Sequence, residues 1–281
     1  MSTTVHEAEA AVTAGPEAPQ PRPLHERKVV VRSAQLGIVV IVLAVWEICA
    51  ATELIDPFFI GQPSKIFGVL VDWVKDGSLF VNLGVTVEEA TIGFFVSAII
   101  GIGLGLLFAR NPLLDRITYP FIDMFNALPR MALAPLFALW FGLGITGKVV
   151  LVFSVAVFNF LINTYSGAKS VDPEYVKMVR LLGATNRELT RKVIIPSIVP
   201  WVIAAMRFAV AYSLAAAVIA EIVAAQHGLG YLLAYTSGVL DTNGQFAALV
   251  VLVLVAWIAN IGISRLARHL LRWQETDDRV L

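Results

Sequence analysis

Apolar residues in this chain fall into long, nearly uninterrupted runs. A helix needs about 20 apolar residues to cross the hydrocarbon core of a bilayer. Six runs approach that length, and they predict transmembrane helices at 34–51, 87–109, 117–141, 149–165, 198–224 and 246–266. The third run is interrupted by Pro120, Pro129 and Pro135, which favours a broken helix there. The pattern predicts an all-α, polytopic membrane helix bundle.

The two ends of the chain do not share this pattern. Residues 1–33 are rich in Ala, Glu, Thr and Pro and contain few large apolar side chains. Such a segment cannot bury enough surface to offset its ordering entropy, so it is predicted to be a disordered tail. Residues 34–270 are expected to form the membrane domain, and 271–281 a short C-terminal tail.

Basic residues orient the predicted spans, because cytoplasmic loops carry an excess of Lys and Arg. These residues concentrate in the N-terminal tail, between the fourth and fifth spans, and at the C-terminal end. The opposite side carries only Lys65, Lys75 and Lys148. Both termini are therefore predicted to be cytoplasmic.

Composition supports a membrane protein and excludes several other classes. The chain is 58% hydrophobic and 15% charged, with a mean hydropathy of +0.77, whereas soluble domains average about 25% charged. Its formal net charge is zero, which gives no support for nucleic-acid binding. A single cysteine, Cys49, excludes an intramolecular disulfide framework and a multi-cysteine zinc site.

The loop between the fourth and fifth spans, residues 167–197, predicts two short helices. Asp172-Pro173-Glu174 is a helix start, and Gly183 ends that helix. Thr185 and Glu188 have the spacing of a capping box for a second helix, expected to end before Pro196. The loop has many apolar positions. Either a partner covers them, or the loop packs on its own spans.

The end of this loop carries a recognisable spacing. Gly183 is followed by nine residues and then Val193-Ile194-Ile195-Pro196. This resembles the EAA loop of ABC importer permeases, in which Glu-Ala-Ala, three residues, Gly and nine residues precede Ile-x-Leu-Pro. Lys177-Met178-Val179 stands where that family has Glu-Ala-Ala.

Further stretches resemble the nitrate, sulfonate and taurine branch of the same family, and the likeness covers about residues 34–270. They are Leu128-Pro129-Arg130-Met131-Ala132-Leu133-Ala134-Pro135-Leu136, Leu139-Trp140-Phe141-Gly142-Leu143-Gly144, Asn163-Thr164, Val171-Asp172-Pro173, Met206-Arg207, Ala220-Glu221 and Gly228-Leu229-Gly230-Tyr231.

The resemblance implies a permease subunit in the cell (inner) membrane that is not itself an enzyme. It implies a second permease copy, two cytoplasmic ATPase subunits that bind the ATP, and an extracytoplasmic solute-binding protein. No cofactor is expected on this chain. The residues implied in coupling to the ATPase are Glu174, Lys177, Arg180, Gly183, Ala184 and Pro196. Glu174 lies one turn before Lys177, and we hypothesise that it replaces the family's glutamate.

Ionisable and amide side chains inside the spans are candidates for a translocation pathway, because burying them in a membrane is costly. They are Arg130, Asn159, Asn163, Arg207 and Glu221. The two arginines are compatible with a small anionic solute such as a sulfonate, nitrate or an organic acid.

Each candidate also has a structural alternative. Arg130 suits the carboxyl end of a helix equally well, and Arg207 suits a helix end or Asp123. Asn159 and Asn163 lie four residues apart on one face, where hydrogen bonds between helices are favoured over solute contact. Glu221, near the outer end, suits a tie between loops. Gly101 and Gly105 suit close helix packing within the chain or between two copies.

Other motifs fail on inspection. The segment 142–148 nearly spells a phosphate-binding loop, but Val149 stands where Ser or Thr belongs, so it is predicted to be an external turn and not an ATP site. The four histidines are scattered, so no metal site is expected. One alternative to an importer subunit is a stand-alone secondary transporter, which often shows internal repeats. The other is a membrane-embedded enzyme, which needs clustered catalytic carboxylates or histidines near one membrane face. The sequence shows no clear repeat and no such cluster.

Overall fold

A computed structural model describes residues 28–271, and every regular element within that range is a helix. The chain divides into two compact units, one ending at Pro57 and the other starting at Phe58. Five helices of the described chain are long and apolar enough to span a membrane, or six if one bent pair counts as a single span. The predicted all-α membrane fold is confirmed.

The N-terminal unit contains one long helix, α2 (Lys28–Ala51). Its large aliphatic side chains from Leu36 to Ile48 are exposed, as suits contact with an apolar environment. The helix begins six residues before the predicted span boundary. The rest of the predicted N-terminal tail, and nearly all of the C-terminal tail, lies outside the described residues.

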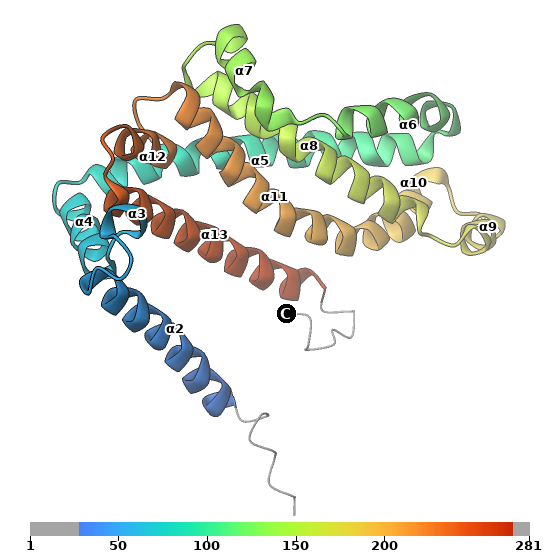
Figure 1. Cartoon of the computed structure of the whole chain (residues 1–281). Coiled ribbons are helices and arrows are strands. Elements are labelled where there is room, and N and C mark those ends of the chain that lie inside the picture. Colours follow the sequence, from blue (N-terminus) through green and yellow to red (C-terminus); the bar gives the residue numbers. More distant parts are fainter. Residues whose placement is uncertain (1–27, 272–281) are drawn as a thin grey trace, which may run out of the picture. The chain divides into compact units, whose positions relative to one another are not determined.

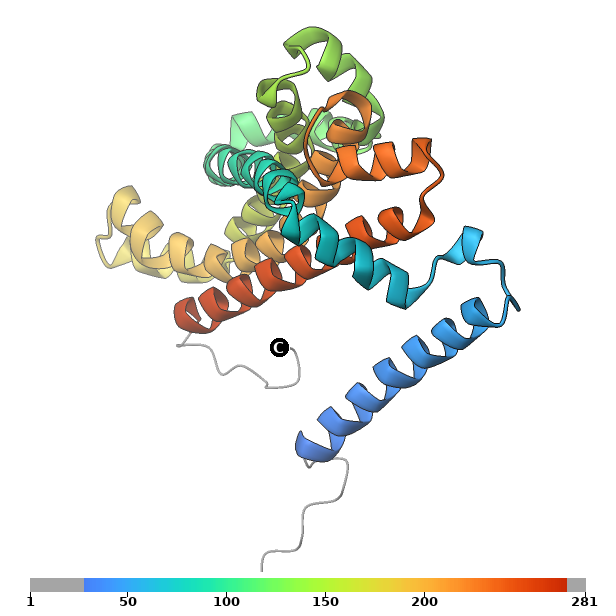
Figure 2. The same cartoon turned by 90° about the vertical axis from the view of Figure 1, so that its left-hand side faces the viewer.

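The second unit contains the remaining helices (Figure 1). They are α3 (Pro57–Ile60), α4 (Pro63–Lys75), α5 (Ser78–Arg110), α6 (Pro112–Asn126), η2 (Arg130–Leu133), α7 (Ala134–Phe141), α8 (Ile145–Lys169), α9 (Pro173–Leu181), α10 (Asn186–Leu189), η3 (Thr190–Ile194), α11 (Ile195–Ala224), α12 (Leu229–Gly238) and α13 (Thr242–Leu270). Helix α13 packs against α11 and α12 (Figure 2).

Helices α5, α8 and α11 pack closely because small residues line their contacts. A Cβ added to Gly101 would lie 2.6 Å from the carbonyl oxygen of Val157, and one on Gly105 would lie 2.6 Å from that of Leu161. The ring of Phe160 packs edge-on against Phe94, 5.4 Å between centroids. The glycines predicted to allow close packing therefore serve the α5–α8 contact within one chain.

The third predicted span is broken as expected. Helix α6 ends at Asn126, and the chain resumes as η2 and α7 with a bend of 73°. Pro129 precedes η2, and Pro135 lies in the first turn of α7. Pro120 lies inside α6 without ending it, so only the later prolines bound the break.

The loop between α8 and α11 has the predicted caps, and its second helix leads into α11 without a break. Asp172 Oδ1 accepts a hydrogen bond from the Glu174 N–H at 2.8 Å. Thr185 and Glu188 form the capping box. The second short helix, α10, ends at Leu189 and so before Pro196 as expected, but the chain stays helical beyond it. A π-helical turn, Thr190–Ile194, lets the Ile195 N–H bond to the Thr190 carbonyl, so the chain enters α11 without needing an N–H at the proline.

Candidate translocation site and coupling loop

A cavity of about 400 Å³ lies beside the broken span. Its lining combines one guanidinium, three carboxamides, one phenol and two aliphatic side chains, from Asn126, Arg130, Val155, Asn159, Ile162, Asn163 and Tyr212. Three of the five predicted pathway residues, Arg130, Asn159 and Asn163, therefore meet here. No carboxylate is among the lining residues.

Arg130 holds the end of α6 and also faces this cavity. Its Nη2 donates to the carbonyl oxygen of Phe125 at 2.6 Å and to Asn126 Oδ1 at 3.4 Å. Its guanidinium carbon lies 4.1 Å from the centroid of the Phe158 ring. The helix-end alternative and the cavity location therefore both apply. Nη1 and Nε carry further N–H groups that can meet a ligand.

At the wall of the cavity, Asn159 joins α8 to α11, and Asn163 bonds to Asn159. Asn159 Nδ2 donates to the Ala205 carbonyl oxygen at 3.0 Å. Asn163 Nδ2 donates to the carbonyl oxygen and to Oδ1 of Asn159, at 2.8 and 3.0 Å. The Asn159 Nδ2 group is thus occupied by the contact with α11. Asn163 Oδ1 has no hydrogen bond among the described residues and can accept one from a solute.

Arg207 does not line the cavity. Its Nε is buried and has no hydrogen-bond partner within residues 28–271. Asp123, the partner suggested by the sequence, forms no ion pair with it in that range. Arg207 and the cavity are thus separate features of α11.

Glu221 lies in a buried junction and not at the cavity. It is 1% exposed. Its Oε1 accepts from Thr86 Oγ1 at 2.7 Å, and its Oε2 accepts from the Gly230 N–H at 2.6 Å. Asn82 accepts from the Gly228 N–H, and Thr86 from the Leu229 N–H. Polar groups of α5 and α11 thus satisfy the free N–H groups that begin α12.

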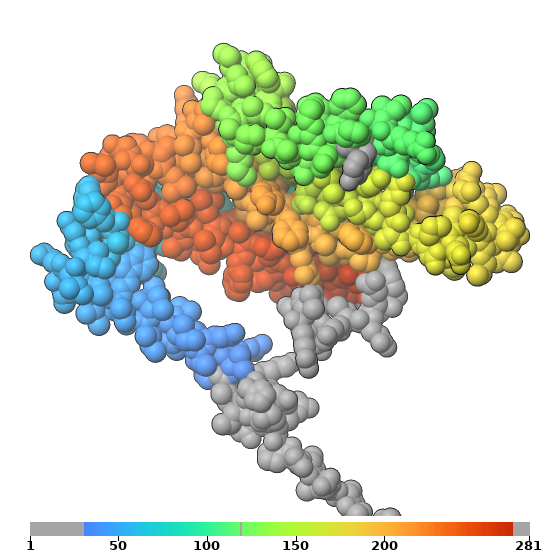
Figure 3. Space-filling model, turned by 45° about the vertical axis from the view of Figure 1, so that its right-hand side comes forward, coloured from blue at the N-terminus to red at the C-terminus, as the bar shows by residue number. Residues whose placement is uncertain are grey.

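The loop between α8 and α11 projects from one end of the second unit (Figure 3, yellow). Five of its six predicted coupling residues are exposed, and Ala184 is half-buried. Leu181 and Leu182 are 88% and 82% exposed, and Tyr175 and Met178 are also exposed. The loop's apolar residues were expected either to pack on the chain's own spans or to be covered by a partner. These four side chains are not covered by the chain's own spans.

A protein-family model described as "Binding-protein-dependent transport system inner membrane component" matches residues 99–275. The chain belongs to this family. It is a membrane-spanning permease subunit of an ABC importer. This assignment decides against a stand-alone secondary transporter.

Curated relatives and solved structures agree with this permease assignment. The formylaminopyrimidine transport permease protein ThiX of Halalkalibacterium halodurans is 31% identical over 83% of this chain and 92% of its own. The taurine transport system permease protein TauC of Escherichia coli is 26% identical over 85% and 88%. The fold is similar to the MetNI methionine ABC transporter, with a TM-score of 0.57 at 20% identity over 70% of this chain and 96% of that one.

Neither the Lys148–Glu89 ion pair nor the place of Tyr212 in the cavity was predicted. Lys148 Nζ lies 2.6 Å from Glu89 Oε1, with side chains only 10% and 3% exposed. The sequence offered a clue, since both charges fall in or beside apolar runs. Tyr212 in the cavity was missed because only charged and amide side chains were considered.

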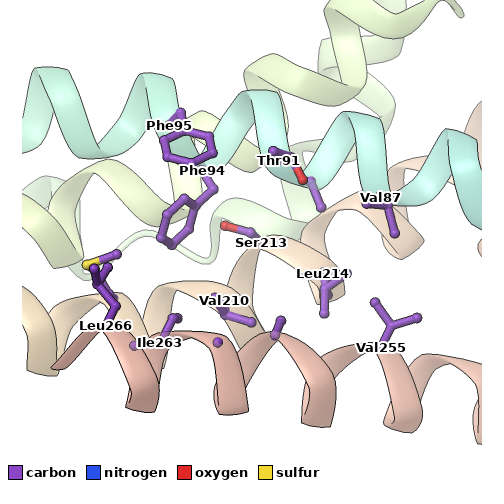
Figure 4. Close-up of a pocket in the computed structure, with 14 residues that line it drawn as sticks. Val87, Thr91, Phe94, Phe95, Val210, Ser213, Leu214, Val255, Ile263 and Leu266 are labelled. Atoms are coloured by element: carbon purple, nitrogen blue, oxygen red, sulfur yellow. The ribbon is translucent and has the colours of Figure 1, made fainter. Parts of the chain in front are cut away.

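A second cavity of the permease, about 310 Å³, lies between α5, α11 and α13 (Figure 4). Side chains such as Phe94, Val210 and Leu266 line it, and its polar side chains are Thr91 and Ser213. It carries no charged group, so it suits a polar solute poorly.

Proposed function

We propose that two copies of this permease form a pathway for a small anionic solute. Two ATPase subunits on the coupling loops would drive the transport, and a binding protein would deliver the solute from outside. The observation that carries the proposal is Arg130 at a cavity lined by carboxamides and by no carboxylate.

The charge of the cavity supports an anion. A guanidinium presents several N–H donors in a plane and binds carboxylate or sulfonate oxygens with two parallel hydrogen bonds. Asn163 Oδ1 and the Tyr212 hydroxyl add groups that can meet a solute's own donors. A cavity of about 400 Å³ suits a solute of few heavy atoms. Taurine, in the name of one relative, has this chemistry.

The break after α6 supports a second copy. Residues 127–129 are exposed and not helical in a single chain. At membrane depth, non-helical backbone is tolerated only where protein buries it or where it lines a water-filled cavity. Lipid is therefore a poor neighbour for this segment. A second copy packed on α6 and α7 would cover it and close the Arg130 cavity.

The coupling loop supports an ATPase partner. Gly183 has φ +87°, a conformation that other residues rarely adopt, and it turns the chain beside the exposed Leu181 and Leu182. An exposed apolar cluster of this kind suits the groove of a partner protein. Glu174, Lys177 and Arg180 would provide its polar rim, with Ala184 and Pro196 at its base.

The test uses the whole importer, with its ATPase and binding protein, in vesicles. Uptake is measured for a panel of sulfonates, carboxylates and neutral analogues of equal size. We expect an anion to be transported, and Arg130→Gln to reduce its uptake at least tenfold. Arg116→Gln, the same charge change at an exposed position of α6, is the matched control. Unchanged uptake by Arg130→Gln, or transport of neutral solutes alone, would contradict the anion proposal.

A further inference from the structure

Asp115, in the first turn of α6, binds two side chains near the C-terminal end of α8. Its Oδ1 accepts a hydrogen bond from the Tyr165 hydroxyl at 2.6 Å. Its Oδ2 lies 2.7 Å from Lys169 Nζ. The Lys169 ammonium also lies 5.6 Å from the centroid of the Tyr165 ring. The three side chains form one cluster, the Asp115 clamp.

The clamp lies between the coupling loop and the cavity along the chain. Lys169 is the last residue of α8, and Asp172, which caps α9, follows three residues later. In the other direction α6 runs from Asp115 to Asn126, about 16 Å along the helix. Arg130 then holds the end of α6. A movement of the end of α8 can therefore reach the cavity through Asp115, helix α6 and Arg130.

Helix α6 depends on the clamp because it buries little surface. None of its described side chains is fully buried. The α5–α8 contact, in contrast, is fixed by glycines against backbone. Apolar contacts are not directional, whereas a carboxylate bound on both oxygens fixes an orientation. The clamp therefore fixes the orientation of α6 relative to the end of α8.

We infer that Asp115 is a positioning residue that transmits movement of the coupling loop to the broken span and its Arg130 cavity. The inference rests on the proposed function, since it takes the loop as the ATPase contact. The hydrogen bonds from Lys169 and Tyr165 hold the pKa of Asp115 below its ordinary value, so the Asp115 carboxyl is ionised at neutral pH.

The test compares ATPase activity with and without solute-loaded binding protein, using the whole importer in vesicles. Asp115→Asn is expected to leave basal hydrolysis within about twofold and to reduce its stimulation at least fivefold. Solute uptake per ATP should fall with it. Arg116→Gln, at the next position, is expected to behave as wild type. Wild-type stimulation in Asp115→Asn would overturn the inference.

A charge exchange separates positioning from folding. Asp115→Lys alone should lose stimulation, and Asp115→Lys with Lys169→Asp should regain at least half of it. Tyr165→Phe should have a smaller effect, because it removes one hydrogen bond and no charge. An exchanged pair that assembles with the ATPase at the wild-type level but stays unstimulated would also overturn the inference.

The two proposals fail in different ways. If Arg130→Gln transports normally while Asp115→Asn is uncoupled, the anion pathway is wrong and the clamp stands. If Arg130→Gln loses uptake while Asp115→Asn remains fully stimulated, the clamp is wrong and the anion pathway stands.

Discussion

Two regions of this permease place charged side chains in or beside candidate membrane-spanning helices, with different hydrogen-bonding surroundings. At the junction of α5, α8, α11 and α12, Glu221 gives both oxygens to hydrogen bonds and Lys148 is paired with Glu89. At the broken span, Arg130 Nη2 donates a hydrogen bond to the last turn of α6, and the other guanidinium N–H groups lie beside a cavity. The proposed pathway role of Arg130 rests on this difference, because its remaining N–H groups can bind a solute.

The largest effect should come from breaking the buried ion pair. Lys148→Met would leave Glu89 buried and uncompensated, at a cost of about 3–5 kcal/mol. Adding Glu89→Leu should restore most of that stability, because an apolar pair of similar size needs no charge partner. Denaturant unfolding in detergent measures both variants, with the exposed Lys75→Met as the control. Equal stability of Lys148→Met and wild type would show that the pair is not needed.

The next largest effect is expected from disturbing the close contact between α5 and α8. Gly101→Ala places a methyl group 2.6 Å from a carbonyl oxygen, so the helices must separate, at about 1–3 kcal/mol. Gly103 lies on the same helix, and a Cβ there meets nothing within 4 Å. Gly103→Ala should therefore be neutral or stabilising by up to about 1 kcal/mol. If both variants have the same melting temperature, the close contact is not what holds α5 to α8.

Replacing Arg130 should affect transport more than stability, in contrast to the two substitutions above. Arg130→Gln is expected to lower uptake at least tenfold, or about 1.4 kcal/mol. Its stability should change by less than about 1 kcal/mol, the usual value of a cation at a helix end. Uptake in vesicles and unfolding in detergent are measured on the same preparation. A large loss of stability with normal uptake would show that Arg130 stabilises the fold and does not bind the solute.

The smallest effect should be the pH dependence of the Asp115 clamp. A carboxyl whose pKa is lowered by folding adds stability above its unfolded pKa and loses it as pH falls through the lowered value. The difference in melting temperature between wild type and Asp115→Asn should therefore be constant from pH 7 to 5. It should shrink below the ordinary value of 3.8. A difference that grows on acidification would exclude this origin.

Much of the fold could be predicted because its signals are local. Apolar runs gave the spans, and two of the three prolines in the third run marked its break. The caps at Asp172 and Thr185 depend on atoms within three residues of each other. The helical path through Pro196 was not predicted, because a proline normally ends a helix. The π-helical turn before it keeps the helix continuous.

The candidate site was predicted only in part. Arg130, Asn159 and Asn163 were identified from their cost in a membrane, yet nothing in the pattern grouped them with Tyr212 or separated them from Arg207 and Glu221. The Asp115 clamp was not predicted at all, because its partners lie 50 and 54 residues away.

The sequence by itself determined the approximate positions of the spans, the caps and the turn at Gly183, because these depend on hydrophobic length and on backbone groups a few residues apart. It placed the start of α5 nine residues too late, at 87 in place of Ser78. Only the tertiary structure decided which charges are satisfied. Lys148 meets Glu89 across 59 residues, and Glu221 meets Thr86 across 135. The packing of the helices sets these distances, and it leaves Arg130 with free donors at the cavity.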